Sequence, residues 1–323
     1  MNILVTGGLG LIGHNVVLRL KQLGHEVHIT DTITDYGIIP EDELDYLLGE
    51  RLKKLDHCHY YTFDISSTLL MRSLFSRNEF DAVIHLASFP RQKVVNVNPI
   101  AGSQVMSEGL INLLELSKEY GVKKFVYISS SMVYGDFTDD VTEDAICNPQ
   151  GQYGILKLAG EWLVKDYARK GYFDYTIIRP SAVYGPLDVE DRVVSKFMLT
   201  AMRGGVLKVN GENETLDFTF VDDAADGIVS ATLSENTKNK TYNITKSHSR
   251  TLLDAAKLAV SIVGKGTIEV RQKDDDFPSR GALNIDAAKR DFNFDPKVDV
   301  EEGFQAYYDW LQNSPFWSSK TAQ

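Results

Sequence analysis

Glycines near the start of the chain recur at a spacing that could bind phosphate groups. They lie in the segment Thr6-Gly7-Gly8-Leu9-Gly10-Leu11-Ile12-Gly13, which follows an apolar run and opens a helical pattern. Gly7 allows a tight turn, Gly10 lets the backbone approach a pyrophosphate, and Gly13 permits close helix packing. This spacing indicates a dinucleotide site, to which Leu11 and Ile12 are assigned as further contacts.

An acidic residue follows at the distance expected for a ribose contact. Asp31 ends the next apolar run, roughly 20 residues beyond Gly13, where dinucleotide-binding units place an acid that accepts hydrogen bonds from the adenosine ribose. Its charge would repel a 2′-phosphate, and Thr32 rather than an arginine comes next. The combination predicts an NAD site that discriminates against NADP.

Further candidate cofactor contacts follow the third and fourth apolar runs. Asp64 and Ile65 would flank the adenine, and Ala87 would line the ribose, with Leu86 and Ser88 on either side of it. Each of these residues alone is more typical of a structural role. In this order they predict one extended cofactor across the carboxyl edge of a sheet.

A phenol and an ammonium lie four residues apart further along the chain. Tyr153 and Lys157 fall on one face of a helix, although this spacing also arises by chance. The helix follows the fifth predicted strand, whose carboxyl end carries the serines Ser129 to Ser131. Because ligands bind at the carboxyl ends of strands in open α/β sheets, this position favours a site role for the pair.

The elements that must position these residues alternate between apolar runs and helical patterns. Helical spacing is seen in Gly13 to Leu23 and in Met106 to Tyr120. Repeated strand-helix-strand units with nearly continuous apolar strands predict an α/β fold with a doubly wound parallel sheet of the Rossmann type. The predicted strands are Asn2 to Thr6, Glu26 to Asp31, His59 to Asp64, Ala82 to Leu86, Lys124 to Ser129 and Tyr175 to Arg179.

Beyond the sixth strand the pattern changes to loops, short strands and separated helices, which predicts a smaller α+β substrate-binding lobe. A helix starting near Asp222 is expected to return to the first domain. We therefore predict an NAD-binding domain over 1–181 that also includes about 217–245, and a lobe formed by 182–216 and 246–323.

The segment from Asp35 to Asp56 stands out as an insertion. Acidic residues at its start and basic residues at its end suit the dipole of a helix. The pattern predicts a solvated surface helix in preference to a partner site.

Composition indicates an ordinary globular protein, with 43% hydrophobic and 24% charged residues. A net charge of -11 without a basic tract disfavours nucleic acid as a partner. Neither a secretory leader pattern nor an apolar run of about 18 residues is seen, so no membrane partner is expected.

The only cysteines, Cys58 and Cys147, fit a reducing cytoplasm. Because His57-Cys58-His59 lacks a second ligand pair at metal spacing, no metal is predicted.

Several motifs follow one another along nearly the whole chain. They are the glycine turn, Asp31, Asp64-Ile65, His85-Leu86-Ala87, Ser129 to Gly135, Tyr153 to Lys157, Arg179-Pro180 to Gly185-Pro186 and Asp217-Phe218 to Asp222-Asp223. Together they resemble the extended short-chain dehydrogenase/reductase family, and specifically its NAD-dependent nucleotide-sugar epimerase/dehydratase branch.

The resemblance implies roles for the hydroxyl, phenol and ammonium groups. The catalytic serine of the family lies four residues before a tyrosine that is Tyr134 here, which selects Ser130 as catalytic and substrate-binding and leaves its serine neighbours as supporting groups. Tyr153 would be the general acid/base. Lys157 would hold the nicotinamide ribose, while its charge and that of oxidised nicotinamide lower the pKa of the phenol. The implied reaction oxidises a sugar hydroxyl and returns the hydride to the other face of the ketone.

The residues Ser131 and Met132 stand where dehydratases and decarboxylases of this family usually carry acids. A thioether cannot protonate a leaving hydroxyl, so elimination and decarboxylation are disfavoured. We expect an NAD-dependent epimerase of a nucleotide-diphosphate sugar acting at C4, of the UDP-glucose 4-epimerase type. The alternatives are an NAD-dependent sugar dehydrogenase or ketoreductase, and a non-catalytic NAD-binding regulator.

On the substrate side, the resemblance implies that Arg192 and Arg280 contact the diphosphate or nucleoside and that Val209 lies near the base. An arginine can offer bidentate donors to a phosphate. The family resemblance also implies a homodimer joined through helices of the first domain.

Three positions depart from the family pattern and remove polar contacts. Frequent Asn, Arg and Asn residues of the family are replaced by Ala182, Leu216 and Met106. A polar cluster, Arg91-Gln92-Lys93, follows the fourth strand near the expected sugar pocket. It would either bind an anionic sugar or form a solvated loop.

Overall fold

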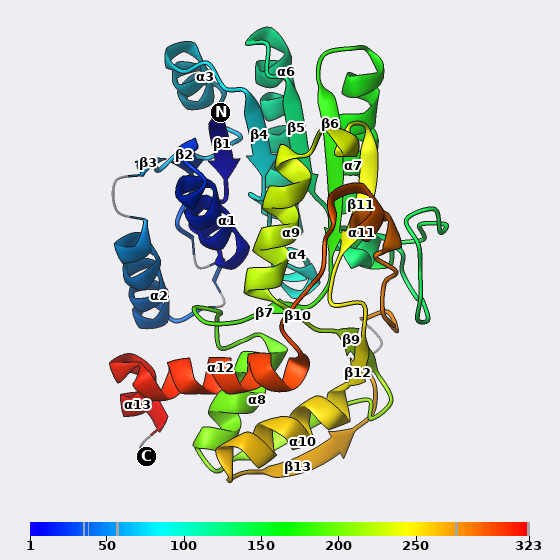
Figure 1. Ribbon diagram of the computed structural model, residues 1–323. Coiled ribbons are helices and arrows are strands. Elements are labelled where there is room, and N and C mark those ends of the chain that lie inside the picture. The colour runs from blue at the N-terminus through cyan, green and yellow to red at the C-terminus, as the bar shows by residue number, and fades with distance from the viewer. Residues whose placement is uncertain (35, 38, 56–57, 275–276, 322–323) are drawn as a thin grey trace.

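A parallel sheet lies at the centre of the computed structural model, which describes residues 1–34, 36–37, 39–55, 58–274 and 277–321. The sheet has seven strands in the order β11-β6-β5-β4-β1-β2-β3 (Figure 1). This architecture confirms the predicted doubly wound Rossmann sheet. The strands are β1 (Asn2–Thr6), β2 (Glu26–Thr30), β3 (His59–Tyr61), β4 (Ala82–His85), β5 (Lys124–Ile128), β6 (Asp174–Pro180) and β11 (Lys240–Ile244).

The order of the strands brings the ends of β1, β4 and β5 together. Every residue of β4 and β5 is buried, as expected for strands covered on both faces. The register pairs Thr6 of β1 with His85 of β4, and His85 with Tyr127 of β5. The strand order reverses between β1 and β4, and ligands of such sheets bind beyond the carboxyl ends at this switch point.

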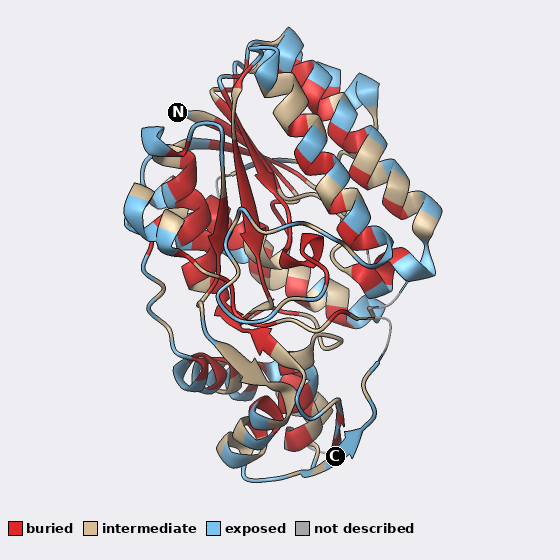
Figure 2. Cartoon of the chain, turned by 90° about the vertical axis from the view of Figure 1, so that its right-hand side faces the viewer, coloured by how far each residue is buried: buried red, intermediate tan, exposed pale blue. Residues whose placement is uncertain are grey.

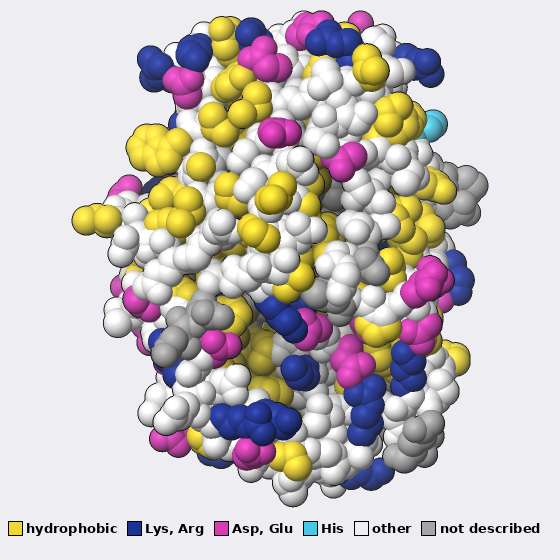
Figure 3. All heavy atoms as spheres, turned by 180° about the vertical axis from the view of Figure 1, so that it is seen from behind, with side chains coloured by type: hydrophobic (Ala, Val, Ile, Leu, Met, Phe, Trp, Pro, Cys, Tyr) yellow, Lys and Arg dark blue, Asp and Glu magenta, His cyan; other side chains and the backbone are white. Residues whose placement is uncertain are grey.

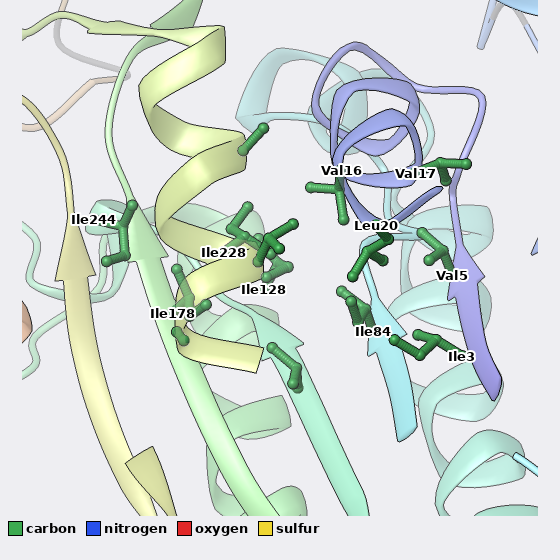
Figure 4. Close-up of a cluster of buried hydrophobic side chains, with 14 of the residues drawn as sticks. Ile3, Val5, Val16, Val17, Leu20, Ile84, Ile128, Ile178, Ile228 and Ile244 are labelled. Atoms are coloured by element: carbon green, nitrogen blue, oxygen red, sulfur yellow. The ribbon is translucent and has the colours of Figure 1, made fainter. Parts of the chain in front are cut away.

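Helices cover both faces of the sheet. On one face α1 packs against α9, and Figure 4 shows Val16 and Leu20 of α1 near Ile228 of α9 in a cluster that also contains Ile3 and Ile84 of the sheet. On the other face, α3, α6 and α7 share a second apolar cluster with the strands. These helices are α1 (Leu11–Gln22), α3 (Thr68–Arg77), α6 (Leu110–Glu119), α7 (Gly151–Arg169) and α9 (Val221–Leu233).

Short helices complete this part of the molecule. Between β4 and α6 the chain forms α4 (Gln92–Val97), α5 (Pro99–Ser103) and a π-helical turn (Gln104–Gly109). Near the end of the chain, α11 (Asp286–Phe292) packs against β11 and α9. Ala288 of α11 lies in the apolar cluster of the sheet, so this part of the segment 246–323 adjoins the sheet rather than the core of the lobe.

The lobe below the sheet is a smaller α+β unit (Figure 1). Its parallel strands β8 and β13 pack with α8, α10, α12 and α13 around a separate apolar core. Two further strand pairs, β7 with β10 and β9 with β12, connect it to the sheet domain. The elements are β7 (Val183–Tyr184), α8 (Val193–Met202), β8 (Val206–Asn210), β9 (Thr215–Asp217), β10 (Thr219–Phe220), β12 (Ser249–Thr251), α10 (Leu252–Val263), β13 (Thr267–Arg271), α12 (Val300–Asn313) and α13 (Pro315–Thr321).

The insertion after β2 forms α2 (Glu41–Lys54), and the prediction of a solvated surface helix holds only for its exposed face. Glu43, Leu47 and Arg51 form a buried stripe at helical spacing. Tyr46 hydrogen-bonds Ser314 of the lobe at 2.7 Å. Because two of the three buried residues are charged, the hydropathy pattern does not reveal that this face of the helix is buried. Asp35 and Asp56, the ends of the predicted segment, lie outside the described residues.

Burial follows these layers. Figure 2 shows buried strands inside the molecule and exposed surfaces on the outer sides of the helices. In the part of the chain that the structure describes, no helix has the length and apolar character needed to cross a membrane.

Candidate active site

A cavity of about 1330 Å³ lies between the carboxyl edge of the sheet and the lobe. All the residues predicted to contact the cofactor line it, as do Ser130, Arg192 and Arg280. The space-filling view shows a hollow with Lys and Arg side chains around it in the lower half of the molecule (Figure 3). The cavity therefore joins the glycine turn, the ends of β4 and β5, and the lobe in one continuous space.

The glycine turn has the close packing that its spacing predicts. Gly7 has a φ of +70°, and a Cβ there would lie 2.6 Å from the backbone nitrogen of Ala87. A Cβ on Gly13 would lie 2.1 Å from the carbonyl oxygen of Gly7. At Gly10, which precedes α1, no described side chain caps the helix. The first amides of α1 are therefore available to an anion such as a pyrophosphate.

Asp31 lies at the end of β2 with its carboxylate held by the backbone. Its two oxygens accept hydrogen bonds from the amides of Leu9 and Ile33, at 3.0 and 3.1 Å. A carboxylate oxygen has more than one acceptor site, so both oxygens remain able to accept ribose hydroxyls. This arrangement fits the predicted NAD contact.

Asp64 and Ile65 have structural contacts in addition to lining the cavity. Asp64 accepts hydrogen bonds from the amide and hydroxyl of Ser66, at 2.8 and 2.6 Å. Ile65 is 3% exposed and packs against Gly109, where a Cβ would come within 2.7 Å of it. The pair therefore shapes the turn after β3 at the cavity wall.

Ser130, Tyr153 and Lys157 meet at the cavity wall. The side chain of Ser130 faces the phenol of Tyr153 and lowers the pKa of that phenol. The Lys157 amine donates to the carbonyl oxygen of Ile128 at 2.7 Å and lies 5.9 Å from the centre of the Tyr153 ring. Because α7 follows β5 and packs on it, the serine from the strand end and the helical pair reach the same point.

The electrostatic surroundings of Tyr153 differ from the expectation. Burial raises the pKa of its phenol, and the groups that lower it are Ser130, Arg192 and Arg280, not Lys157. Burial also lowers the pKa of the Lys157 amine to about 7, against the opposing charge of Glu161. The two arginines from the substrate side therefore contribute to ionisation of the phenol.

The serines that end β5 have three different partners. Ser129 donates to Glu161 at 2.6 Å, whereas Ser131 contacts Ser181 at 3.2 Å. Of the three, only Ser130 lowers the pKa of the Tyr153 phenol. The neighbours of Ser130 thus anchor the strand end, in agreement with the supporting role assigned to them from the sequence.

Glu161 is a buried carboxylate that sequence reasoning missed. It is fully buried and receives two hydrogen bonds from Arg179, at 2.8 and 2.6 Å. Its position four residues after Lys157, on the same face of α7, is the signal that could have identified it. This ion pair ties α7 to β6 beneath the candidate catalytic groups.

Met132 contributes an apolar surface at the expected position of an acid. It is 5% exposed and belongs to an apolar cluster with Phe89, Met106 and Tyr153. It also lines the cavity. The wall beside the phenol therefore carries a thioether that cannot exchange protons.

One predicted substrate contact does not face the cavity. Val209 is fully buried in the core of the lobe and does not line the cavity, so its place near the base stays a prediction. Side chains alternate along β8, and its neighbours Lys208 and Asn210 line the cavity instead. Arg280 does line it, and its buried Nε has no hydrogen-bond partner among the described residues.

The cluster after β4 is paired with an acid. Arg91 and Lys93 both bind the carboxylate of Asp191, at 2.6 and 2.8 Å. Gln92 is buried. The cluster is therefore an ordered part of the cavity wall and not a solvated loop.

Comparison with known proteins identifies the family of the chain. The model of the NAD dependent epimerase/dehydratase family matches residues 3–245. A UDP-glucuronate 4-epimerase of Thermodesulfobacterium geofontis is 28% identical, over 96% of each chain. A UDP-glucuronic acid decarboxylase of Arabidopsis thaliana is also 28% identical, over 94% of this chain and 68% of that protein.

A solved structure shares the fold over nearly its full length. The UDP-glucuronic acid 4-epimerase of Bacillus cereus, in complex with UDP-glucuronic acid and NAD, is 28% identical. It has a TM-score of 0.87, covering 96% of this chain and 98% of that one. The predicted family resemblance and the predicted cofactor, NAD, are thereby confirmed. This chain belongs to the NAD dependent epimerase/dehydratase family.

Proposed function

We propose that the protein is an NAD-dependent epimerase of a nucleotide-diphosphate sugar that acts at C4 through a transient keto-sugar. The observation that carries the proposal is the meeting of Ser130, Tyr153 and Lys157 at a wall where Met132 occupies the place of an acid. The relatives include both an epimerase and a decarboxylase. We therefore assign the choice between the two reactions to the residues of this wall.

The cofactor half of the cavity fits NAD. The uncapped amides after Gly10 suit the pyrophosphate, and Asp31 suits the adenosine ribose. Lys157 would hold the nicotinamide ribose. When bound, NAD supplies a hydride acceptor and, once reduced, a hydride donor.

The proton transfers fall to the residues of this chain. Tyr153, as phenolate, takes the proton of the sugar hydroxyl as that carbon is oxidised, and Ser130 orients the hydroxyl by hydrogen bonding. The cations of Arg192 and Arg280 favour the phenolate. After the keto-sugar turns over, Tyr153 returns the proton to its oxygen as the carbon is reduced on the other face.

Met132 supports hydride transfer without elimination. Loss of water requires an acid that protonates the leaving hydroxyl, and a thioether has no such proton. Within the apolar cluster that it shares with Tyr153, Met132 excludes water from the reacting carbon. The intermediate is therefore retained as the keto-sugar and is reduced again.

The lobe half of the cavity carries the donors for the diphosphate. Arg192 and Arg280 line it, and guanidinium groups can donate hydrogen bonds to phosphate oxygens. Lys208 adds a cation from β8. We accordingly assign the cofactor to residues 1–181 with about 217–245, and the substrate largely to the remainder.

Proton NMR of turnover tests the proposed function. The protein would be given NAD with UDP-glucose in one arm and UDP-glucuronate in another, and the absorbance of NADH would be followed in parallel. We expect the C4 epimer of one sugar to form without net NADH. Net NADH formation would instead establish a dehydrogenase, and NAD binding without turnover of any nucleotide sugar would favour the regulator.

The Tyr153→Phe variant tests the proposed base directly. It should retain NAD but lose about 100-fold or more in turnover, because only the proton-transferring oxygen is removed. Tyr308→Phe on α12 is a matched control, since Tyr308 does not line the cavity. Undiminished turnover by Tyr153→Phe would remove this residue from the mechanism.

We further propose a homodimer built on α6 and α7. Large apolar side chains are exposed there, namely Ile111 (41%), Ile155 (51%) and Trp162 (66%), and a second copy would bury them. Sedimentation equilibrium should give twice the mass of 36.2 kDa, and Trp162→Glu should reduce it to a monomer. A wild-type monomer at micromolar concentration would contradict the proposal.

A cytoplasmic location is proposed with the function. The chain has two cysteines, Cys58 and Cys147, which make an unpromising disulfide framework and suit a reducing compartment. Localisation of a tagged full-length chain by fractionation tests this assignment, and recovery in an oxidising compartment would contradict it.

A further inference from the structure

Arg51, from α2, lies between the two halves of the cavity. It is 7% exposed and lines the cavity. One guanidinium nitrogen donates to the carbonyl oxygen of Leu9, in the glycine turn, at 2.9 Å. The other donates to the carbonyl oxygen of Leu187 at 2.6 Å. A single side chain therefore joins the turn that binds the cofactor to the loop that follows β7.

The glycine-turn contact continues to the adenosine ribose site. The amide of Leu9 donates to Asp31 at 3.0 Å, while its carbonyl oxygen accepts from Arg51. The backbone of Leu9 is thus held by hydrogen bonds at both its amide and its carbonyl oxygen. A shift of Arg51 would move the residue that holds Asp31 and that precedes the uncapped start of α1.

The Leu187 contact continues to the substrate side. Leu187 is a buried non-glycine residue with a φ of +69°, a conformation that surrounding contacts must maintain. The next residue, Asp188, is 2% exposed and faces the cations of Arg192, Arg51 and Arg91. Arg192 in turn acts on the phenol of Tyr153. The loop held by Arg51 therefore carries a proposed substrate contact.

Unpartnered polar atoms gather at this junction. Among the described residues, Nε of Arg51, Nε of Arg91 and Oδ2 of Asp188 are buried without a hydrogen-bond partner. Buried polar groups in folded proteins are almost always paired, and all three residues line the cavity. The polar atoms of the junction are therefore not fully paired within the part of the protein that the structure describes.

We propose that Arg51 is a positioning residue that couples the two ligands, so that NAD and the nucleotide sugar each bind more tightly when the other is present. The inference rests on the proposed function for the identity of the second ligand. Its physical basis is that either ligand orders a segment attached to Arg51, which lowers the conformational cost of binding the other.

Calorimetric titration measures this coupling without turnover. NAD would be titrated into NAD-free protein in the presence and absence of saturating UDP, and UDP binding would be measured separately. We expect UDP to tighten NAD binding by about fivefold or more in the wild type. In Arg51→Met the ratio should fall to about one, because both carbonyl contacts are lost.

Two further variants separate coupling from general damage to the fold. Arg203→Met is the matched control, because Arg203 binds Glu190 of the same loop but does not line the cavity; it should keep the wild-type ratio. Arg51→Lys retains the charge beside Asp31 and Asp188, but a single ammonium lacks the planar fork that spans the two carbonyls. It should fold and still lose most of the coupling.

The outcomes distinguish the inference from the proposed function. A wild type that binds UDP with no effect on NAD would overturn the coupling alone, as would Arg51 variants that keep the wild-type ratio. A wild type that binds neither UDP nor any other nucleoside diphosphate would refute the nucleotide-sugar function and the coupling together. Equal loss of coupling in Arg203→Met would show that the loop, and not Arg51, is responsible.

Discussion

Lys157→Met should abolish a pH dependence of stability that originates in the buried amine. Lys157 is 4% exposed, and burial lowers the pKa of its amine to about 7, whereas an unfolded lysine has a pKa of about 10.4. Between these values the unfolded state binds the additional proton, so the free energy of unfolding rises with pH. The slope approaches about 1.4 kcal/mol per pH unit, so roughly 2–3 kcal/mol is gained between about pH 7.5 and 9.5.

Urea unfolding of NAD-free protein at these two pH values measures the effect. Lys123→Met is the matched control, because the Lys123 side chain is 81% exposed and lies outside the cavity. The wild type and the control should both gain stability as the pH rises, and Lys157→Met should gain about 2 kcal/mol less. An equal gain in the wild type and in Lys157→Met would refute the reasoning.

Three more substitutions have defined outcomes. Asp31→Ala should weaken NAD binding and relax discrimination against NADP, because a carboxylate that accepts ribose hydroxyls and repels a phosphate is lost; an unchanged ratio of the two dissociation constants would exclude this role. Glu161→Gln should lower the free energy of unfolding by about 3–5 kcal/mol, because Arg179 loses its buried partner charge; a loss below about 1 kcal/mol in denaturant unfolding would contradict this. Ala182→Gly should raise the free energy of unfolding by roughly 0.5–1 kcal/mol, because Ala182 has a strained φ of +36°. A melting temperature no higher than that of the wild type would count against that strain.

The backbone at Ala182 also explains a departure from the family pattern. The position has a left-handed backbone, which asparagine adopts more readily than alanine. The asparagine frequent in the family therefore suits this position for its backbone as well as for its side chain. Sequence reasoning identified only the loss of a polar contact, because a strained φ is not visible from residue type.

Much of the cofactor half was predictable, because its signals are local. The glycine spacing, the acid that ends β2 and the helical pair Tyr153 and Lys157 each depend on residues that are close in sequence. The rule that ligands bind beyond the carboxyl ends of parallel strands then places these signals together. The structure accordingly brings all of these residues to the wall of one cavity.

The substrate half of the cavity was less predictable, because the face of a strand on which a side chain lies decides whether that side chain lines the cavity. Val209 and Lys208 are adjacent in β8, yet only Lys208 lines the cavity. In a short strand that alternates between an apolar core and a ligand, the sequence shows which residues alternate but not which face meets the cavity. The packing of β8 against α8 and α10 determines that face.

By itself, the sequence determined the doubly wound sheet, the dinucleotide turn and the apolar residue Met132 beside the phenol, because periodicity, glycine spacing and residue type act over short distances. Only the tertiary structure decided which buried charges meet. Arg51 lies 42 residues from Leu9 and 136 residues from Leu187 in the chain, yet it hydrogen-bonds both. Such contacts follow from the packing of whole elements, since a buried charge is tolerated only where the fold supplies its partners.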